Sequence, residues 1–276
     1  MSPLRAALRT IGDLAERAIA PVGLVADEIP RQRRALAETA HRPWRLPERP
    51  WLMGQTWYDL LFAHWELPAE ALRPLVPAPL ELDLRDGRAW LGITPFVVGG
   101  LRLRGAPPLP RLSRFPELNV RTYVRYDERP GIYFFSLDAG SRSAVAAARR
   151  AYRLPYFHAQ MSADRDLETV RYESWRVDST GPPAELAARY RPTGPALPIE
   201  DGSLERWLAE RYCLYVVDRR GRPLRGEIHH APWPLQPGSA TIQRNTMATP
   251  LGLELSDPLL HFSARQDTLI WPLEPA

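Results

Sequence analysis

The chain contains 276 residues, and all 36 of its Lys and Arg side chains are arginine. Without lysine it cannot form a Schiff base, anchor pyridoxal phosphate or supply a P-loop lysine, because a guanidinium is not deprotonated in proteins. The 32 acidic side chains nearly balance the arginines, which leaves a formal net charge of +4. These charges are interspersed, a pattern that favours a solvated surface over a nucleic-acid interface.

The cysteine count and the apolar segments bear on the cellular compartment. Cys213 is a single cysteine, so the chain has no intramolecular disulfide and no cysteine-rich zinc site. No apolar stretch is long enough for a transmembrane helix, and charged residues interrupt the N-terminus where a signal peptide would be apolar. We therefore expect a cytoplasmic protein without a transmembrane segment.

Residues 1–49 are predicted to form a helical N-terminal extension that precedes a single domain over residues 50–276. Apolar residues recur every three or four positions over 3–20, which is typical of an amphipathic helix. A second short helical piece is expected between Pro21 and Pro30, followed by an extended connector rich in Pro and Arg. The apolar face lacks Trp and Phe, which favours packing against the domain over a membrane-surface helix or a dimer contact.

After the connector the sequence is typical of a mainly β protein. Short runs rich in β-branched and aromatic residues alternate with Pro and Gly turns. Hairpins are predicted for residues 80–84 with 89–94, 120–126 with 132–137, and 214–217 with 224–230. Helical pieces are predicted for residues 69–76, 141–152 and 203–212. This pattern indicates an α+β fold dominated by a β-barrel or sandwich with a few peripheral helices.

Residues 115–126 carry polar side chains at alternate positions. Period-two alternation places five of them on one face of a strand, namely Glu117, Asn119, Arg121, Tyr123 and Arg125. Such a face could hold a carboxylate with its guanidinium groups while keeping a carboxyl group for proton transfer. The alternative is a solvated face with a cross-strand ion pair.

Histidines and one aromatic corner are further candidates. Tyr156 and His158 alternate on a second strand and share a face, whereas the adjacent His229 and His230 must point to opposite faces. A metal site would need His64 or His158 to converge with one of that pair, and no metal-binding motif is present. We therefore expect no metal and no cofactor. Hydrogen-bonded interior histidines are the alternative.

The Trp and Pro residues that follow His230 predict a rigid aromatic corner. Trp233 lies between two prolines in this segment. Two interpretations stay open, since the corner could be a wall of a pocket or simply the closure of the barrel.

Several separated segments together resemble the YqjF-like family of uncharacterised proteins. They are Trp57–Trp65, Asp86–Gly92, Pro116–Val124, Gly131–Asp138, Leu154–Ala159, and Glu210–Tyr215 with Ile228–His230. The resemblance runs in order from about Trp51 to the C-terminus. That family is related to the acetoacetate decarboxylase-like superfamily, which implies a cone-shaped, strongly bent β-barrel around a central cavity with a polar mouth.

The resemblance also implies a departure in mechanism. The decarboxylases use a Pro-Lys-Lys segment for the Schiff-base lysine and its neighbouring cation. Pro155 matches the proline, whereas Tyr156 and Phe157 stand where the lysines would be, and Glu117 is similar in position to the cavity glutamate. Imine-forming decarboxylation is therefore excluded. The implied pocket contains Glu117, Asn119, Arg121, Tyr156 and His158, with Tyr123 and His229 as further members.

We expect this pocket to take a small keto, carboxylated or phenolic compound. In an enzyme, Arg121 would hold an anionic group, Glu117 or His158 would move a proton, and Tyr156 would donate to a developing oxyanion. Asn119, Tyr123 and His229 would bind the substrate. The alternatives are a non-catalytic binding or sequestering module and a structural protein whose side chains fill the cavity. Homo-oligomerisation is left open.

Overall fold

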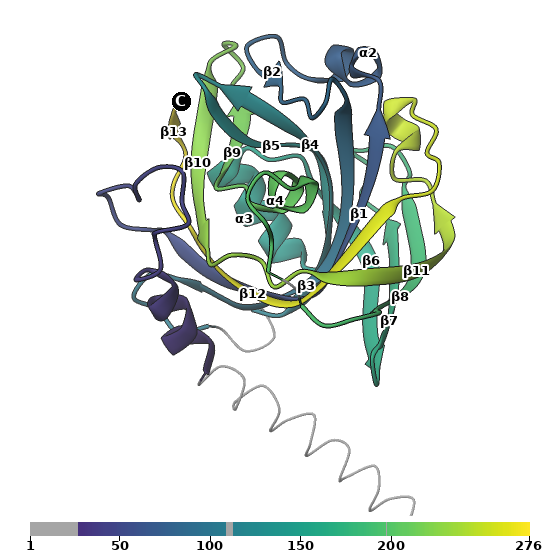
Figure 1. Cartoon of the computed structure of the whole chain (residues 1–276), viewed down its shortest axis with the longest axis horizontal. Helices are drawn as coiled ribbons and strands as arrows, with labels where there is room; N and C mark the ends of the chain where they lie inside the picture. The colour runs from purple at the N-terminus through teal and green to yellow at the C-terminus, as the bar shows by residue number, and fades with distance from the viewer. Residues whose placement is uncertain (1–26, 109–112, 197) are drawn as a thin grey trace, which may run out of the picture.

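The computed structural model describes residues 27–108, 113–196 and 198–276, and these residues form mainly β-strands (Figure 1). Among them, thirteen strands make one mixed sheet. The strands are β1 (Met53–Leu67), β2 (Glu81–Leu82), β3 (Ala89–Leu103), β4 (Phe115–Tyr126), β5 (Arg129–Ala139), β6 (Tyr156–Asp166), β7 (Thr169–Arg176), β8 (Glu185–Pro192), β9 (Cys213–Val217), β10 (Pro223–His230), β11 (Gln236–Asn245), β12 (Leu259–Ile270) and β13 (Glu274–Pro275). The named helices are α2 (Ala69–Leu72), α3 (Arg142–Tyr152) and α4 (Leu204–Ala209), with 3₁₀ turns η1 (Arg73–Leu75) and η2 (Thr249–Leu251). In the described part of the chain, no helix is long and apolar enough to span a membrane.

The sheet closes on itself twice, because β5 and β12 are branch points at which two rings meet. β5 pairs with β4, β6 and β9, and β12 pairs with β1, β10 and β11. A first ring consists of β12, β1, β3, β4, β5, β9 and β10. A second ring shares β12, β1, β3, β4 and β5 with the first and is completed by β6, β7, β8 and β11. The predicted mainly β architecture with few helices is confirmed, and closure leaves few free sheet edges.

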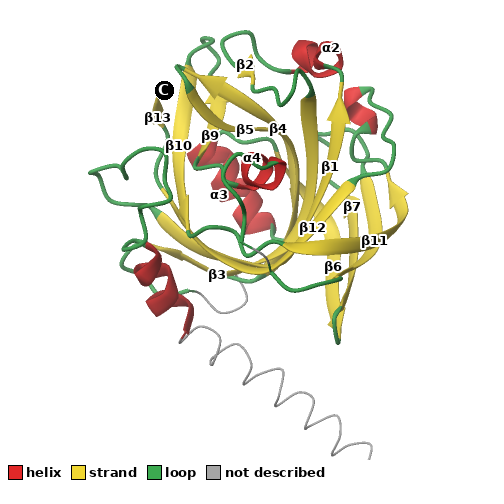
Figure 2. Ribbon diagram, viewed as in Figure 1, coloured by secondary structure: helices red, strands yellow, loops and turns green. Residues whose placement is uncertain are grey.

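The two rings are filled differently. The second ring encloses a packed core that includes Tyr172, Tyr190 and Phe262. Into the first ring pack α3 and α4 (Figure 2), and their residues Tyr152 and Leu208 belong to its apolar cluster. The first ring therefore has helices as well as strands for walls.

Two irregular strands turn additional side chains into the first ring. In β5, a register shift opposite Val120 and Arg121 leaves Phe134 and Leu137, three positions apart, on the same inner side. In β1, a register shift around Asp59, whose φ is 51°, likewise leaves Trp57 and Leu60 on the inner side. Regular alternation would have turned one residue of each pair away.

The predicted hairpins are partly correct. β4 with β5 and β9 with β10 form the second and third hairpins. The first prediction was wrong in its pairing, although the turn at Asp86 and Gly87 is present with φ values of 52° and 77°. Before that turn, β2 pairs with β4 rather than with β3, because β3 already has β1 and β4 as neighbours.

The predicted helices begin where expected. The Ser141 and Ser203 hydroxyl groups accept hydrogen bonds from the backbone of Ala144 and Arg206, and so cap α3 and α4. The structure ends α4 at Ala209, before the predicted end at Tyr212, and divides the segment 69–76 into α2 and η1.

The described part of the N-terminal extension contacts the barrel. A helix covers residues 27–35 and continues past Pro30, which was expected to bound the second helical piece. Gln32 donates to Thr56 Oγ1 at 3.3 Å, and the Tyr58 hydroxyl donates to Glu28 Oε1 at 2.7 Å. The amphipathic helix predicted over 3–20 lies outside the described residues.

Closure between β5 and β9 depends on a glycine, so we predict that Gly131→Ala destabilises the fold. A Cβ at this position would lie 2.7 Å from Cys213 Sγ and 2.9 Å from the backbone oxygen of Cys213. The atomic shifts that the added Cβ forces should make the variant less stable. We expect its free energy of unfolding, measured by urea denaturation, to be lower than that of the wild type by about 1–3 kcal/mol. Gly194→Ala is the matched control, because its Cβ would meet Pro237 at an ordinary 3.6 Å. Equal stability of the two variants would contradict this account.

Candidate functional site

The first ring encloses a cavity of about 200 Å³. Four of the residues predicted for the pocket line it, namely Glu117, Asn119 and Arg121 from β4 and Tyr156 from β6. The three β4 side chains are each less than a tenth exposed. The solvated-face alternative is therefore excluded for these positions, and the cavity is not completely filled by side chains. Arg125, at the end of the same face, is exposed and pairs with Glu81.

The pairing of β3 with β4 arranges the polar end of the cavity in rows. Thr94 lies opposite Asn119, and Gly92 lies opposite Arg121. A Cβ at Gly92 would lie 3.3 Å from Arg121 Cγ and 3.2 Å from a carbon of the His64 ring. The glycine therefore leaves the space in which the Arg121 side chain lies against β3.

Glu117 and Tyr156 form a neutral hydrogen-bonded pair. The Tyr156 hydroxyl donates to Glu117 Oε1 at 3.1 Å. Burial raises the pKa of Glu117 to about 8, although the hydrogen bond from Tyr156 opposes the shift. Burial and the neighbouring Glu117 raise the pKa of Tyr156 well above its ordinary value. At neutral pH the cavity therefore contains a protonated carboxyl group that can act as a general acid.

Arg121 is a buried cation without a matching carboxylate. Of the four other buried arginines, Arg42, Arg176 and Arg211 each pair with a carboxylate, whereas Arg102 donates to the side-chain oxygen of Gln32. Among the described residues no carboxylate pairs with Arg121, and its Nε has no hydrogen-bond partner. Its guanidinium lies 5.4 Å from the centre of the Phe62 ring. Since Glu117 is neutral at pH 7, this end of the cavity carries an uncompensated positive charge.

Further polar atoms near Arg121 also lack partners within the described part of the chain. They are Asn119 Oδ1, Thr94 Oγ1 and Trp233 Nε1, and all three residues line the cavity. A buried polar atom without a partner costs about 1–3 kcal/mol. Several such atoms around one cavity indicate a place for a polar ligand or for water.

Tyr123 lies behind Arg121 and not on the cavity wall. Its hydroxyl lies 2.6 Å from His64 Nε2, and both side chains are fully buried. Burial, reinforced by the charge of Arg121, lowers the pKa of His64 well below its ordinary value, so this histidine is neutral. The predicted direct contact of Tyr123 with substrate is therefore replaced by a contact with Arg121, whose guanidinium lies 5.9 Å from the tyrosine ring centre.

His158 does not share the cavity with Tyr156, so the expectation that they converge was wrong. It lies in an outer groove with Arg149 and Asp178. α3 explains the separation, because its alanine face lines the cavity while its opposite face, with Arg149, lines the groove. Strand alternation was correct here, but the helix lies across that face.

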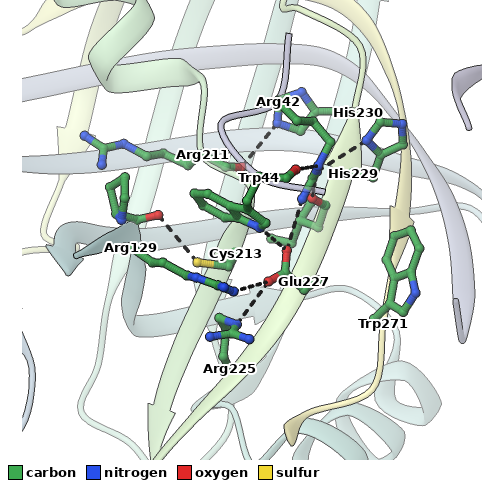
Figure 3. Close-up of polar contacts among 12 residues, drawn as sticks. Arg42, Trp44, Arg129, Arg211, Cys213, Arg225, Glu227, His229, His230 and Trp271 are labelled. Carbon is green, nitrogen blue, oxygen red and sulfur yellow. Dashed lines mark hydrogen bonds and ion pairs between the residues drawn. The ribbon is translucent and has the colours of Figure 1, made fainter. Parts of the chain in front are cut away.

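His229 also lies away from the cavity, contrary to expectation, because the N-terminal extension covers it (Figure 3). Its Nε2 donates to the backbone oxygen of Ala35 at 2.7 Å, and Arg42 lies 3.3 Å from its Nδ1. Arg42 also pairs with the buried Glu227 at 3.0 Å. Burial lowers the pKa of His229 to about 4, so it is a neutral interior histidine. In the part of the chain that the structure describes, no cluster suitable for a metal ion is found.

Two parts of the cavity wall were not predicted from the sequence. The role of the aromatic corner at Trp233 was left open, and the face of α3 that borders the cavity was not anticipated. Trp233 lines the cavity and stacks on Trp57 with 5.9 Å between ring centres, so the aromatic corner is a pocket wall. One face of α3 forms another wall with four alanines, Ala144, Ala147, Ala148 and Ala151. Their i, i+3, i+4, i+7 spacing is visible in the sequence, but alanine faces also occur in ordinary packed helices.

Comparison with known proteins places the chain in a family. Residues 54–267 match the model of the DUF2071 family, which is described as "Uncharacterized conserved protein". The chain therefore belongs to this family, as the sequence resemblance implied. It is 46% identical over 230 residues to the uncharacterized protein YqjF of Bacillus subtilis (strain 168), covering 83% of this chain and 94% of that protein.

Solved structures share the fold at low sequence identity. The enduracididine biosynthesis enzyme MppR in complex with pyruvate has a TM-score of 0.58 and 11% identity, covering 86% of this chain and 94% of that one. An acetoacetate decarboxylase has a TM-score of 0.55 and 15% identity, covering 88% and 97%. An acetoacetate decarboxylase-like enzyme from Sphingomonas wittichii RW1 has a TM-score of 0.54 and 12% identity, covering 87% and 100%. The fold is thus acetoacetate decarboxylase-like.

The raised pKa of Glu117 predicts a specific pH dependence of stability. Unfolded Glu117 loses its proton near its ordinary pKa of 4.5, whereas folded Glu117 keeps it until about pH 8. The folded state binds more protons in this window, so the free energy of unfolding falls as the pH rises through it. Glu117→Gln should remove this loss, worth on the order of 3 kcal/mol between pH 5 and pH 8. Urea unfolding at both pH values measures it, with the exposed Glu81→Gln as control. Parallel pH profiles for wild type and Glu117→Gln would contradict a buried neutral carboxyl group.

Proposed function

We propose that the cavity binds a small carboxylated keto compound and that Glu117 transfers a proton to or from it without a Schiff base. The observation that carries the proposal is the buried guanidinium of Arg121, which has no carboxylate partner among the described residues and lines the same cavity as the neutral pair of Glu117 and Tyr156. A carboxylate would satisfy the buried cation with charge-assisted hydrogen bonds. The pyruvate bound to MppR, a protein of similar fold, is consistent with this ligand class.

The positions along β4 suggest how such a ligand would lie. Alternate residues on a strand are about 7 Å apart, so Asn119 lies between Arg121 and Glu117 on the inner face. A carboxylate at Arg121 would place the rest of a short compound toward Asn119 and Glu117. The protonated carboxyl group of Glu117 would then donate to a carbonyl oxygen, and the Tyr156 hydroxyl would stabilise the carboxylate left after proton transfer. In tautomerisation a water molecule would take the C3 proton while Glu117 protonates the carbonyl oxygen, and the water would then return a proton to Glu117. In hydration a water molecule would add to the protonated carbonyl and return its extra proton to Glu117.

A binding or sequestering module is the second candidate, and one observation favours it. Glu117 is the single carboxyl group among the described residues that line the cavity, and at neutral pH it is protonated. A proton-transfer cycle that needs a base would have no second carboxylate to use. The same cavity without turnover would still use Arg121 to select an anion.

Replacing Arg121 should separate binding from stability. In Arg121→Met the buried unpaired charge is gone, so we expect the free energy of unfolding without ligand to rise by about 1–3 kcal/mol. The same variant should lose the increase in melting temperature that pyruvate and longer 2-oxo acids give the wild type. Arg125→Met is the matched control on the exposed end of the same strand, and should keep the increase. An undiminished ligand effect in Arg121→Met would refute the assigned anion site.

Turnover can be tested without knowing the natural product. A 2-oxo acid incubated in D₂O exchanges its C3 hydrogens when it passes through an enol, which ¹H NMR follows directly. We expect wild-type protein to accelerate the exchange and Glu117→Gln to abolish the acceleration while Glu81→Gln retains it. Exchange at the buffer rate with wild-type protein, together with ligand-induced stabilisation, would refute the catalytic part and leave the binding module.

A further inference from the structure

Most of the cavity wall is apolar, although its inner end is polar. The apolar residues come from the strands and the segments next to them, and include Leu60, Leu103, Phe115, Phe134, Leu137 and Ile270. A ligand as small as its own polar head would leave these side chains facing water. An amphipathic ligand would cover them, at roughly 25 cal/mol for each Å² of apolar surface removed from water.

The alanine face of α3 makes room for such a ligand. Ala144, Ala147, Ala148 and Ala151 all line the cavity and present nothing larger than a methyl group. On the other face of the same helix, Val145 is buried and Arg149 pairs with Asp178 at 2.8 Å. From Ala144 to Ala151 the helix therefore turns only methyl groups to the cavity, and the one larger α3 side chain on the wall is Tyr152, at the end of the helix.

The cavity has a mouth at its apolar end. Leu103 lines the cavity and is 59% exposed. Ala147 and Ala151 also line the cavity and are exposed. Arg121, in contrast, lines the inner end and is 7% exposed. A ligand that enters beside α3 would reach Arg121 with its polar end and leave its apolar end next to the alanines.

The volume limits the length of the apolar part. A cavity of about 200 Å³ holds roughly seven water-sized groups of ~30 Å³ each. A carboxylate with an adjacent carbonyl takes up about half of this space. The remainder fits a chain of about three to five carbons.

We propose that the cavity selects amphipathic acids, with a 2-oxo acid head at Arg121 and a short unbranched apolar tail along the alanine face of α3, with Ala148 setting the tail length. This inference rests on the proposed function, because it needs the anion site at Arg121. It is independent of turnover. The shortest 2-oxo acid is then a poor ligand, and specificity lies in α3 rather than in β4.

Calorimetric titration with a homologous series tests the inference. The probes are pyruvate, 2-oxobutanoate, 2-oxopentanoate, 2-oxohexanoate and 2-oxooctanoate. With wild-type protein each added methylene should lower Kd roughly fourfold up to 2-oxohexanoate, and the longest member should gain nothing further. In Ala148→Leu the added side chain takes the tail space, so 2-oxohexanoate should bind at least about tenfold more weakly. Pyruvate should change less than about twofold, since its head lies at β4.

Two further variants keep the test decisive. Ala146→Leu adds the same side chain to the exposed opposite face of α3, where Ala146 borders the outer groove, and should leave the series unchanged. Ala147→Leu lies at the exposed mouth and should reproduce the loss if Ala148→Leu is too unstable to purify. Kd values that do not fall with chain length, with pyruvate still bound through Arg121, would overturn the tail inference and leave the proposed function standing. Failure of every acid to bind would overturn both.

Discussion

The site is organised by the guanidinium of Arg121 inside the first ring, a buried charge that no carboxylate of the described residues compensates. Burying an ion without a partner costs several kcal/mol, which is why the other buried pairs, such as Arg176 with Asp138, bring a carboxylate with them. At Arg121 the nearest acid of the cavity wall, Glu117, is itself kept neutral by burial. A fold that contains such a charge is less stable than it need be, and under the proposed function binding of an anion would recover that loss. Arg121 therefore favours a ligand-binding role for the barrel over a purely structural one.

The fold allows this charge because the strands around it cannot easily shift. β5 and β12 each have three neighbours, so the inner face of β4 is fixed from both sides of the ring. Gly92 gives the arginine its space, and the irregularities in β1 and β5 turn Trp57 and Leu137 toward the same cavity. The result is a rigid polar end, built on strands, that faces an apolar end bordered by a helix. A preorganised charge of this kind needs no rearrangement when its ligand arrives.

The sequence predicted the polar residues of β4 because alternation is a local property of an extended chain. Glu117, Asn119 and Arg121 share a face whatever else the protein does. Their burial was not predictable from the same pattern, since a solvent-exposed sheet has the same alternation. That burial follows from the branching of the sheet at β5 and β12. The strand pairings at these branches join segments that are far apart in the chain. The resemblance to a decarboxylase-like family predicted the barrel fold and predicted that Tyr156 and Glu117 lie close together.

The predictions that His158 and His229 line the pocket were wrong for a related reason. His158 has the correct strand face, but α3 lies between it and the cavity. His229 has the correct strand, but the N-terminal extension, whose packing no periodicity specifies, lies on it. The absence of lysine, in contrast, excludes imine formation from composition alone. At the position implied for the decarboxylase lysine this chain has Tyr156, which hydrogen-bonds to the cavity acid. The proposed proton transfer therefore uses this hydrogen-bonded pair in place of an imine.

The central claim is that Arg121 is the receptor for an anionic head group, and a crystal structure of the protein with 2-oxohexanoate tests it most directly. The account predicts the carboxylate in contact with the Arg121 guanidinium, the carbonyl oxygen toward Glu117, and the alkyl chain against Ala148. A ligand bound with its carboxylate at the mouth, or bound outside the first ring while the Arg121 guanidinium contacts only water, would contradict it.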